Sequence, residues 1–209
     1  MAISGRASDW ADTFPDGFIP DILALVFSAW AQLKKPAMDD LEVPITRRFC
    51  AKLRQEKKLQ TLPFTISRQT KIDDSGGIEL GELDLCFTAG RREDVYFAFE
   101  CKRLRIPYPN GCRPNNSEYV QEGMLRFIEA QYAHGLEQGG MIAYVMDGDT
   151  ASAIMGVSTA IRRRQGDLKM VPGEGLLRSS IEPDREEARE TRHHLQVRAF
   201  KMHHLFLAV

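Results

Sequence analysis

The sequence predicts an α/β fold, a three-layer α/β/α sandwich around a mixed central sheet. One observation is a set of three strand-like runs joined by short polar and glycine-rich connections, which favour an antiparallel meander. Another is a later, almost wholly apolar run between two helical stretches, which is typical of a strand covered on both faces. With 209 residues, 43% of them hydrophobic and 27% charged, we expect a single domain over residues 1–209.

The first segment, residues 1–15, is rich in small and polar residues and is expected to form a loosely held arm. After Pro20-Asp21, apolar residues recur at three- and four-residue steps, which predicts a first helix ending near Lys35-Pro36. This apolar segment is interrupted by polar residues and is too short to span a bilayer. We therefore expect a soluble, cytoplasmic protein.

A second helix is expected to start after Asp39 or Asp40, either of which suits the helix cap, with Pro44 in its first turn. Glu42 is followed one turn later by apolar positions. Because residues three and four apart share a helix face, its carboxylate is expected to lean toward the buried side. The predicted inward stripe consists of Leu41, Ile45, Phe49 and Leu53.

The remaining elements follow from apolar runs and turn residues. Strands are predicted at 64–71, 78–88 and 94–102, followed by a proline-rich loop at 107–116. Ser117 is expected to cap a helix that runs to about Gln138. A buried strand at 140–146, a helix at 150–164, an irregular surface excursion at 166–191 and closing strands at 194–200 and 202–209 complete the prediction.

Composition narrows the classes of function. A formal net charge of −1 gives no global attraction to nucleic acid, so polyanion binding would need a local basic patch or a metal ion. The cysteines have no C-x-x-C pair, which disfavours a zinc knuckle and a disulfide framework; they are Cys50, Cys86, Cys101 and Cys112. Cys86 and Cys101 fall on opposite faces of neighbouring strands, so no disulfide is expected between them.

A carboxylate and an amine share one face of the third predicted strand. Side chains two apart on a strand point the same way, so Glu100 and Lys102 lie on the face opposite Phe99 and Cys101. If the preceding hairpin is centred near residues 91 and 92, residues whose numbers sum to about 183 or 184 face each other. Asp84 is then predicted to lie opposite Glu100.

These three side chains suit phosphoryl chemistry. Directly opposed residues of an antiparallel pair have β-carbons about 5 Å apart, close enough for two carboxylates to bind one ion. Mg²⁺ would relieve the repulsion between Asp84 and Glu100, with Mn²⁺ as a substitute. Lys102 would orient the attacking water and stabilise charge that develops on the phosphate.

The residues Gly81-Glu-Leu-Asp84-Leu and Phe99-Glu100-Cys-Lys102 resemble the PD-(D/E)XK nuclease superfamily, whose signature is an acid on one strand and E-x-K on the next. Leu83 stands where that signature has its proline. The resemblance covers roughly Leu41 to Asp147 and implies a restriction endonuclease-like fold. It implies Asp84 and Glu100 as metal ligands, the backbone carbonyl of Cys101 as a further ligand and Lys102 as the catalytic lysine.

The same resemblance implies further roles. Glu42 matches the position from which some members supply another acidic residue, so it resembles an auxiliary metal or water ligand. From the helix that follows E-x-K, Gln121, Glu122 or Arg126 would approach the scissile phosphate. Arg103 and Arg105 lie just beyond the site and are candidates for nucleic-acid binding. The implied activity is Mg²⁺-dependent endonucleolytic hydrolysis of DNA, with bacterial restriction or anti-phage defence as the setting and a homodimer or a defence-complex partner as possible assemblies.

Other interpretations stay open. The trio is also compatible with an exposed cross-strand ion pair, and Glu42 with an ordinary first-turn helix acid. A catalytically inactive module of the same fold, binding nucleic acid or a partner protein, is the alternative function, and RNA is an alternative substrate. The triplet Arg162-Arg163-Arg164 suits either phosphate contacts or the helix dipole. Each of the doublets His193-His194 and His203-His204 can lend only one side chain to a site, so no zinc site is expected there.

Overall fold

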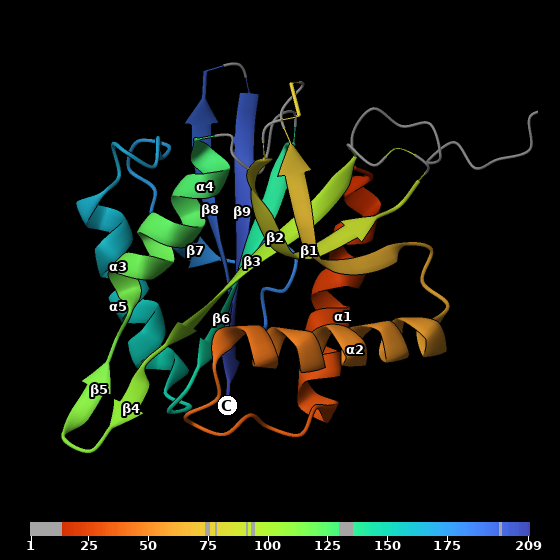
Figure 1. Cartoon of the computed structure of the whole chain (residues 1–209). Helices are drawn as coiled ribbons and strands as arrows, with labels where there is room; N and C mark the ends of the chain where they lie inside the picture. The colour runs from red at the N-terminus through yellow and green to blue at the C-terminus, as the bar shows by residue number, and fades with distance from the viewer. Residues whose placement is uncertain are drawn as a thin grey trace, which may run out of the picture.

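The computed structural model describes residues 14–73, 76–77, 79–90, 92, 95–129, 136–196 and 198–209. A seven-stranded mixed sheet in the order β1-β2-β3-β6-β9-β8-β7 forms the centre (Figure 1). Its strands are β1 Thr65–Asp73, β2 Glu79–Thr88, β3 Tyr96–Leu104, β6 Gln138–Val145, β7 Leu177–Arg178, β8 Ala188–Leu195 and β9 Arg198–Ala208. Helices cover both faces of this sheet, which confirms the α/β prediction.

Helices α1 (Ile19–Gln32) and α2 (Glu42–Gln60) cover one face and follow a short 3-10 turn, Asp16–Phe18. The predicted N-terminal arm lies mostly outside the described residues. The first helix stops at Gln32, before the predicted end, because Leu33 already adopts an extended backbone. The second helix ends where Thr61 takes a left-handed conformation.

The predicted cap of α2 was wrong. Leu41 is the cap residue and has no capping hydrogen bond from its side chain, whereas the Asp40 carboxylate accepts the backbone N–H of Ala37 and pairs with Arg48. Because Leu41 precedes the first helical turn, its side chain is 62% exposed and does not join the inward stripe. The rest of the stripe is fully buried, as predicted: Ile45, Phe49 and Leu53.

Strands β1, β2 and β3 form the predicted antiparallel meander. The numbers of the paired residues of β2 and β3 sum to 184, from Thr88 opposite Tyr96 to Leu85 opposite Phe99, which confirms the register. The alternation along β3 is also confirmed, since Phe97, Phe99 and Cys101 face the α1–α2 side while Tyr96 and Ala98 face the other. Beyond the meander, β3, β6 and β9 run parallel.

The segment after β3 differs from the prediction. In place of a loop, residues 107–116 contribute to a two-stranded hairpin, β4 (Ile106–Tyr108) and β5 (Gly111–Arg113). The helix that follows starts after Asn115 rather than at a Ser117 cap. It consists of α3 (Asn116–Tyr119), the π-helical turn η3 (Val120–Met124) and α4 (Leu125–Ile128). The described part of this helix ends in a turn at residue 129, and residues 130–135 are not among the described residues. Gln138, the predicted end of the helix, belongs to β6.

The C-terminal third is more regular than predicted. Strand β6 is buried on both faces. Asp149 is the N-cap of α5 (Thr150–Arg163), and its side chain accepts the N–H of Ser152. The predicted surface excursion at 166–191 contains β7 and the start of β8, where Thr191 is fully buried. Strand β9 is continuous, so the predicted break near residue 201 was wrong. Within the described residues, none of the helices has both the length and the apolar character needed to cross a bilayer.

Buried histidines of β8 and β9 form a hydrogen-bond network. The Thr191 hydroxyl joins His193 Nε2 at 2.8 Å to His204 Nε2 at 2.9 Å. His204 Nδ1 lies 2.9 Å from the Tyr119 hydroxyl, and His193 Nδ1 lies 2.8 Å from the Leu168 carbonyl oxygen. These rings pair with protein groups in the core. Cys86 and Cys101 are free thiols facing opposite cores, as predicted.

Candidate active site

The predicted acids and the lysine meet where β2 and β3 separate. The ladder between the two strands ends at the pair Leu85 and Phe99, while β3 continues against β6 on its other edge. One residue beyond the last pair, the Asp84 carboxylate Oδ2 accepts the backbone N–H of Cys101 at 2.7 Å. If the ladder continued, the Cys101 N–H would donate to a backbone carbonyl of β2. The Asp84 carboxylate accepts this N–H instead, and the bond fixes the carboxylate beside β3.

Glu100 lies at the centre of the cluster and is only 2% exposed. Its Oε1 accepts Lys102 Nζ at 2.8 Å and Arg126 Nη1 at 3.1 Å. Its Oε2 is buried and has no hydrogen-bond partner in the described part of the chain. Burial, reinforced by the negative charge of Asp84, raises the pKa of Glu100 to about 7, although Lys102 and Arg126 act in the opposite direction.

Lys102 connects the carboxylates. Its Nζ also donates to the Cys101 carbonyl oxygen at 3.1 Å and lies 3.4 Å from Glu42 Oε1. Burial alone would lower the pKa of Lys102, but the charges of Glu100 and Glu42 outweigh burial and raise it above its ordinary value. Because Lys102 contacts several acids, it is held as an ammonium. Glu100, by contrast, is only partly ionised at neutral pH.

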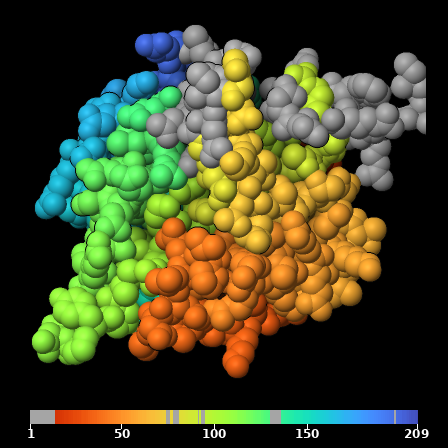
Figure 2. Space-filling model, viewed as in Figure 1, coloured from red at the N-terminus to blue at the C-terminus, as the bar shows by residue number. Residues whose placement is uncertain are grey.

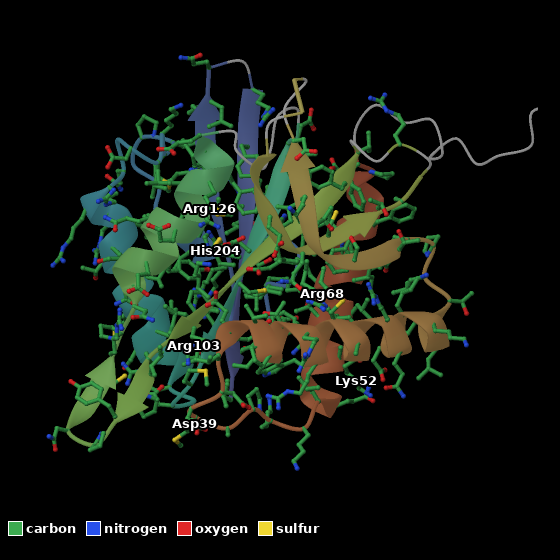
Figure 3. The ribbon with its side chains drawn as sticks, viewed as in Figure 1. Asp39, Lys52, Arg68, Arg103, Arg126 and His204 are labelled. Atoms are coloured by element: carbon green, nitrogen blue, oxygen red, sulfur yellow. The ribbon has the colours of Figure 1, made fainter. Side chains whose placement is uncertain are left out.

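Glu42 enters from the other side of the sheet, at the first residue of α2. Its Oε2 accepts the backbone N–H of Arg103 at 2.8 Å, so the carboxylate ties α2 to β3 next to the lysine. The Arg103 side chain adds a second hydrogen bond between β3 and the start of α2, because its Nη1 donates to the Asp40 carbonyl oxygen at 2.9 Å. Figure 3 shows Arg103 at the N-terminal end of α2 and Arg126 on the helical segment across the cluster.

The π-helical turn η3 brings Arg126 to the cluster. Such turns widen a helix by one residue and recur at functional sites. Within the turn, Gly123 lies against β3 and β6: a β-carbon there would clash with the side chain of Met141 and lie 3.8 Å from Glu100 Cγ. Gly123 was not among the predicted site residues, although a glycine inside a helical pattern is a sign of close approach.

The other predicted nucleic-acid contacts are not gathered at this cluster. Gln121 is exposed, and Glu122 lies 3.6 Å from Arg126 at the edge of the helix. Arg105 is engaged elsewhere, with its Nε donating to both oxygens of Asp147 and its Nη2 3.3 Å from Asp149 Oδ2. Of the predicted contacts, only Arg103 and Arg126 border the acids.

The residues fit a hard divalent cation bound with help from its substrate. Burial raises the pKa of Asp84 as well as that of Glu100, so a cation would relieve two crowded acids, and the Glu100 Oε2 lacks a partner. The described residues contain no group of three or more His, Cys, Asp or Glu side chains able to hold a metal by themselves. Mg²⁺ commonly takes one or two carboxylates and completes its shell with water and phosphate oxygens, so two acids are sufficient.

In Figure 2, atoms with the yellow-green colour of β3 are visible between the green α3–α4 segment and the orange α2. Comparisons with protein-family models, with curated proteins and with solved structures found no match for this chain.

Proposed function

We propose that the protein is a Mg²⁺-dependent nuclease with a restriction endonuclease-like fold that hydrolyses phosphodiester bonds in DNA. One observation carries the proposal: Asp84, Glu100 and Lys102, which are dispersed in the sequence, converge at the separation of β2 and β3, with Glu42 of α2 completing the cluster. Bacterial restriction or anti-phage defence is the setting that the family resemblance suggests.

Each residue has a distinct task in this proposal. Asp84 and Glu100 would hold Mg²⁺, with the Cys101 carbonyl as a further oxygen ligand, and Mn²⁺ would substitute for Mg²⁺. A cation held there would supply a water of lowered pKa and would offset phosphate charge. Lys102 orients the attacking water and stabilises negative charge on the phosphate, since its pKa is raised and it remains an ammonium at neutral pH.

Glu42 and Arg126 position Lys102 and Glu100. Glu42 holds α2 against β3 through the Arg103 N–H and keeps the lysine amine over the strand end. Arg126 balances the charge of Glu100 from the opposite side. Glu42 lies at ion-pair distance from Lys102, and Arg126 lies at ion-pair distance from Glu100. Replacing Glu42 or Arg126 therefore shifts the cluster without removing a metal ligand.

The direct test is cleavage of supercoiled plasmid with Mg²⁺ or Mn²⁺, beside Asp84→Asn and Lys102→Ala variants. Asp84→Asn retains an oxygen that can accept the Cys101 N–H and removes the charge. We expect each variant to lose at least about 100-fold in rate, the usual cost of removing a group that stabilises developing charge. A matched control is Lys58→Ala, because Glu56-Lys57-Lys58 is a second E-x-K sequence, located on α2 away from the cluster.

Metal binding provides a second readout. Mg²⁺ or Mn²⁺ should raise the melting temperature of the wild type and not that of Asp84→Asn, because a ligand stabilises only the state that binds it. Cleavage that survives both active-site substitutions would identify a contaminating nuclease and refute the assignment. Single-stranded DNA and RNA, tested in parallel, decide the substrate class.

The alternative, an inactive module of the same fold, is favoured by one observation. Lys102 and Arg126 already occupy Oε1 of Glu100, so the cluster is nearly balanced in charge without a metal. In that case the wild type leaves plasmid, single strands and RNA intact, and divalent ions leave its melting temperature unchanged.

A further inference from the structure

A groove lined by three arginines lies between α5, α3 and the β4–β5 hairpin. These elements are at the lower left of Figure 1. The volume of the groove is about 710 Å³. Positions three or four apart on α5, from Ser152 through Gly156 and Thr159 to Arg163, line one wall. The start of α3 and the hairpin form the other wall.

The groove is long, and its wall on α5 combines small residues with the larger side chains of Met155 and Arg163. From Ser152 to Arg163 the helix rises about 16 Å, at 1.5 Å per residue. The Asn116 side chain occupies the space that a β-carbon at Gly156 would need, so α3 and α5 approach closely there. At 3.4 Å per nucleotide along a B-form strand, such a length accommodates roughly five nucleotide steps.

Three arginines line the groove: Arg105, Arg113 and Arg163. Arg105 is matched by Asp147 at 2.7 Å and Asp149 at 3.3 Å, so Arg113 and Arg163 are the cations that a ligand in the groove would meet. Arg113 pairs with Glu118 at 2.6 Å in an exposed position, and exposed pairs of this kind contribute little and open readily. Arg163 is exposed and makes no ion pair with another residue of the described part.

These two arginines lie toward different ends of the groove. Arg113 precedes Pro114, whose carbonyl oxygen accepts the N–H of Arg105, and the Arg105 side chain pairs with Asp149 at the start of α5. Arg163 is the last residue of that helix. A small anion such as phosphate would meet the charge at one end only. A chain of phosphates spaced along the groove would meet the charge at both ends.

The groove is also close to the candidate active site. Asn115, which lines the groove, donates its side-chain N–H to the carbonyl oxygen of Arg103, the residue after Lys102, at 3.3 Å. We propose that this groove binds the phosphodiester backbone of a nucleic-acid strand next to the bond that is cleaved. The choice of ligand rests on the proposed nuclease function, and the site is separate from the acids that would bind the metal.

Binding measured without a metal tests the groove independently of cleavage. The probe is a fluorescein-labelled 20-nucleotide DNA, single-stranded and as a duplex, titrated in EDTA over a range of salt concentrations and followed by fluorescence anisotropy. The proteins are the wild type, Arg113→Ala, Arg163→Ala and the double variant. The control is Arg162→Ala, which removes the same charge from the neighbouring position of α5, where the side chain does not line the groove.

We expect each groove variant to bind about tenfold more weakly and to lower the slope of log affinity against log salt by about one, the signature of one lost phosphate contact. The double variant should lose both contacts, and Arg162→Ala should keep the wild-type slope. Wild-type affinity and slope in the double variant would overturn the proposal. So would an equal loss in Arg162→Ala, which would indicate diffuse attraction.

Two further outcomes separate the groove from the catalytic assignment. If the groove variants lose binding while the wild type cleaves nothing, the groove is supported and the nuclease proposal fails. If the wild type binds no DNA but inorganic pyrophosphate raises its melting temperature, and Arg163→Ala abolishes that rise, the groove takes a small anion and the polymer assignment is wrong.

Discussion

Glu100→Gln should make the protein more stable at pH 8. The carboxylate is buried beside Asp84, and the pKa of Glu100 is raised from 4.5 to about 7 even though Lys102 and Arg126 donate to it. Ionised Glu100 is therefore a net cost to the fold. Glutamine retains an oxygen for the two donors and resembles the protonated acid in shape, so the substitution removes the charge with little change in packing.

The magnitude follows from the two pKa values. Each tenfold change in acidity corresponds to about 1.4 kcal/mol, so ionising Glu100 costs the folded state about 3 kcal/mol more than the unfolded chain. Because the folded pKa is the higher one, the cost is absent well below pH 4.5 and complete above pH 7. The glutamine variant should gain about 3 kcal/mol at pH 8 and less than about 1 kcal/mol at pH 5.

Urea denaturation at pH 5 and pH 8 measures both free energies, and thermal melts should show a rise of roughly 6 to 12 °C at pH 8 for a chain of this size. The control is Glu82→Gln on the exposed side of β2, which should change stability little at either pH. A Glu100→Gln variant that is less stable than the wild type at pH 8, or equally stabilised at both pH values, would show that Lys102 and Arg126 fully compensate the buried charge.

Further expected outcomes concern the core around the site. Burial lowers the pKa of both His193 and His203 to about 4. Their contribution to stability is therefore present above the unfolded pKa of 6.5 and is lost as the pH falls toward 4. His193→Gln should weaken this loss of stability in acid, measured by urea titrations between about pH 7 and pH 4. Gly123→Ala should cost about 1 kcal/mol, the low end for overpacking, because its β-carbon meets the flexible end of the Met141 side chain. Met141→Ala should remove this contact, and additive losses in the double-mutant cycle would contradict it.

Local regularities made the centre of the site predictable. The side-chain alternation along β3 and the register with β2 depend on a strand period of two and on a hairpin, so neighbouring residues suffice to place Asp84 beside Glu100 and Lys102. The same reasoning assigned the free cysteines Cys86 and Cys101 to opposite faces.

Local patterns were less reliable at the ends of elements. Leu41 fits the apolar stripe of α2 by spacing, yet it lies before the first turn and faces solvent, since a spacing pattern does not mark where a helix starts. The π-helical turn η3 was also missed, because it packs against distant segments of β3 and β6. The hairpin of β4 and β5 was missed although its pairing is local, because its prolines and glycine also suit a loop.

By itself, the sequence determined which residues share a face of β3 and which acid faces them across the hairpin, because covalent geometry and strand pleating act over a few residues. Only the tertiary structure decided that Glu42 would reach Lys102 from 60 positions away, that Gly123 would admit Arg126 to Glu100, and that three arginines would line one groove. Those contacts depend on how helices pack against a twisted sheet, and packing follows from the whole core rather than from any local pattern.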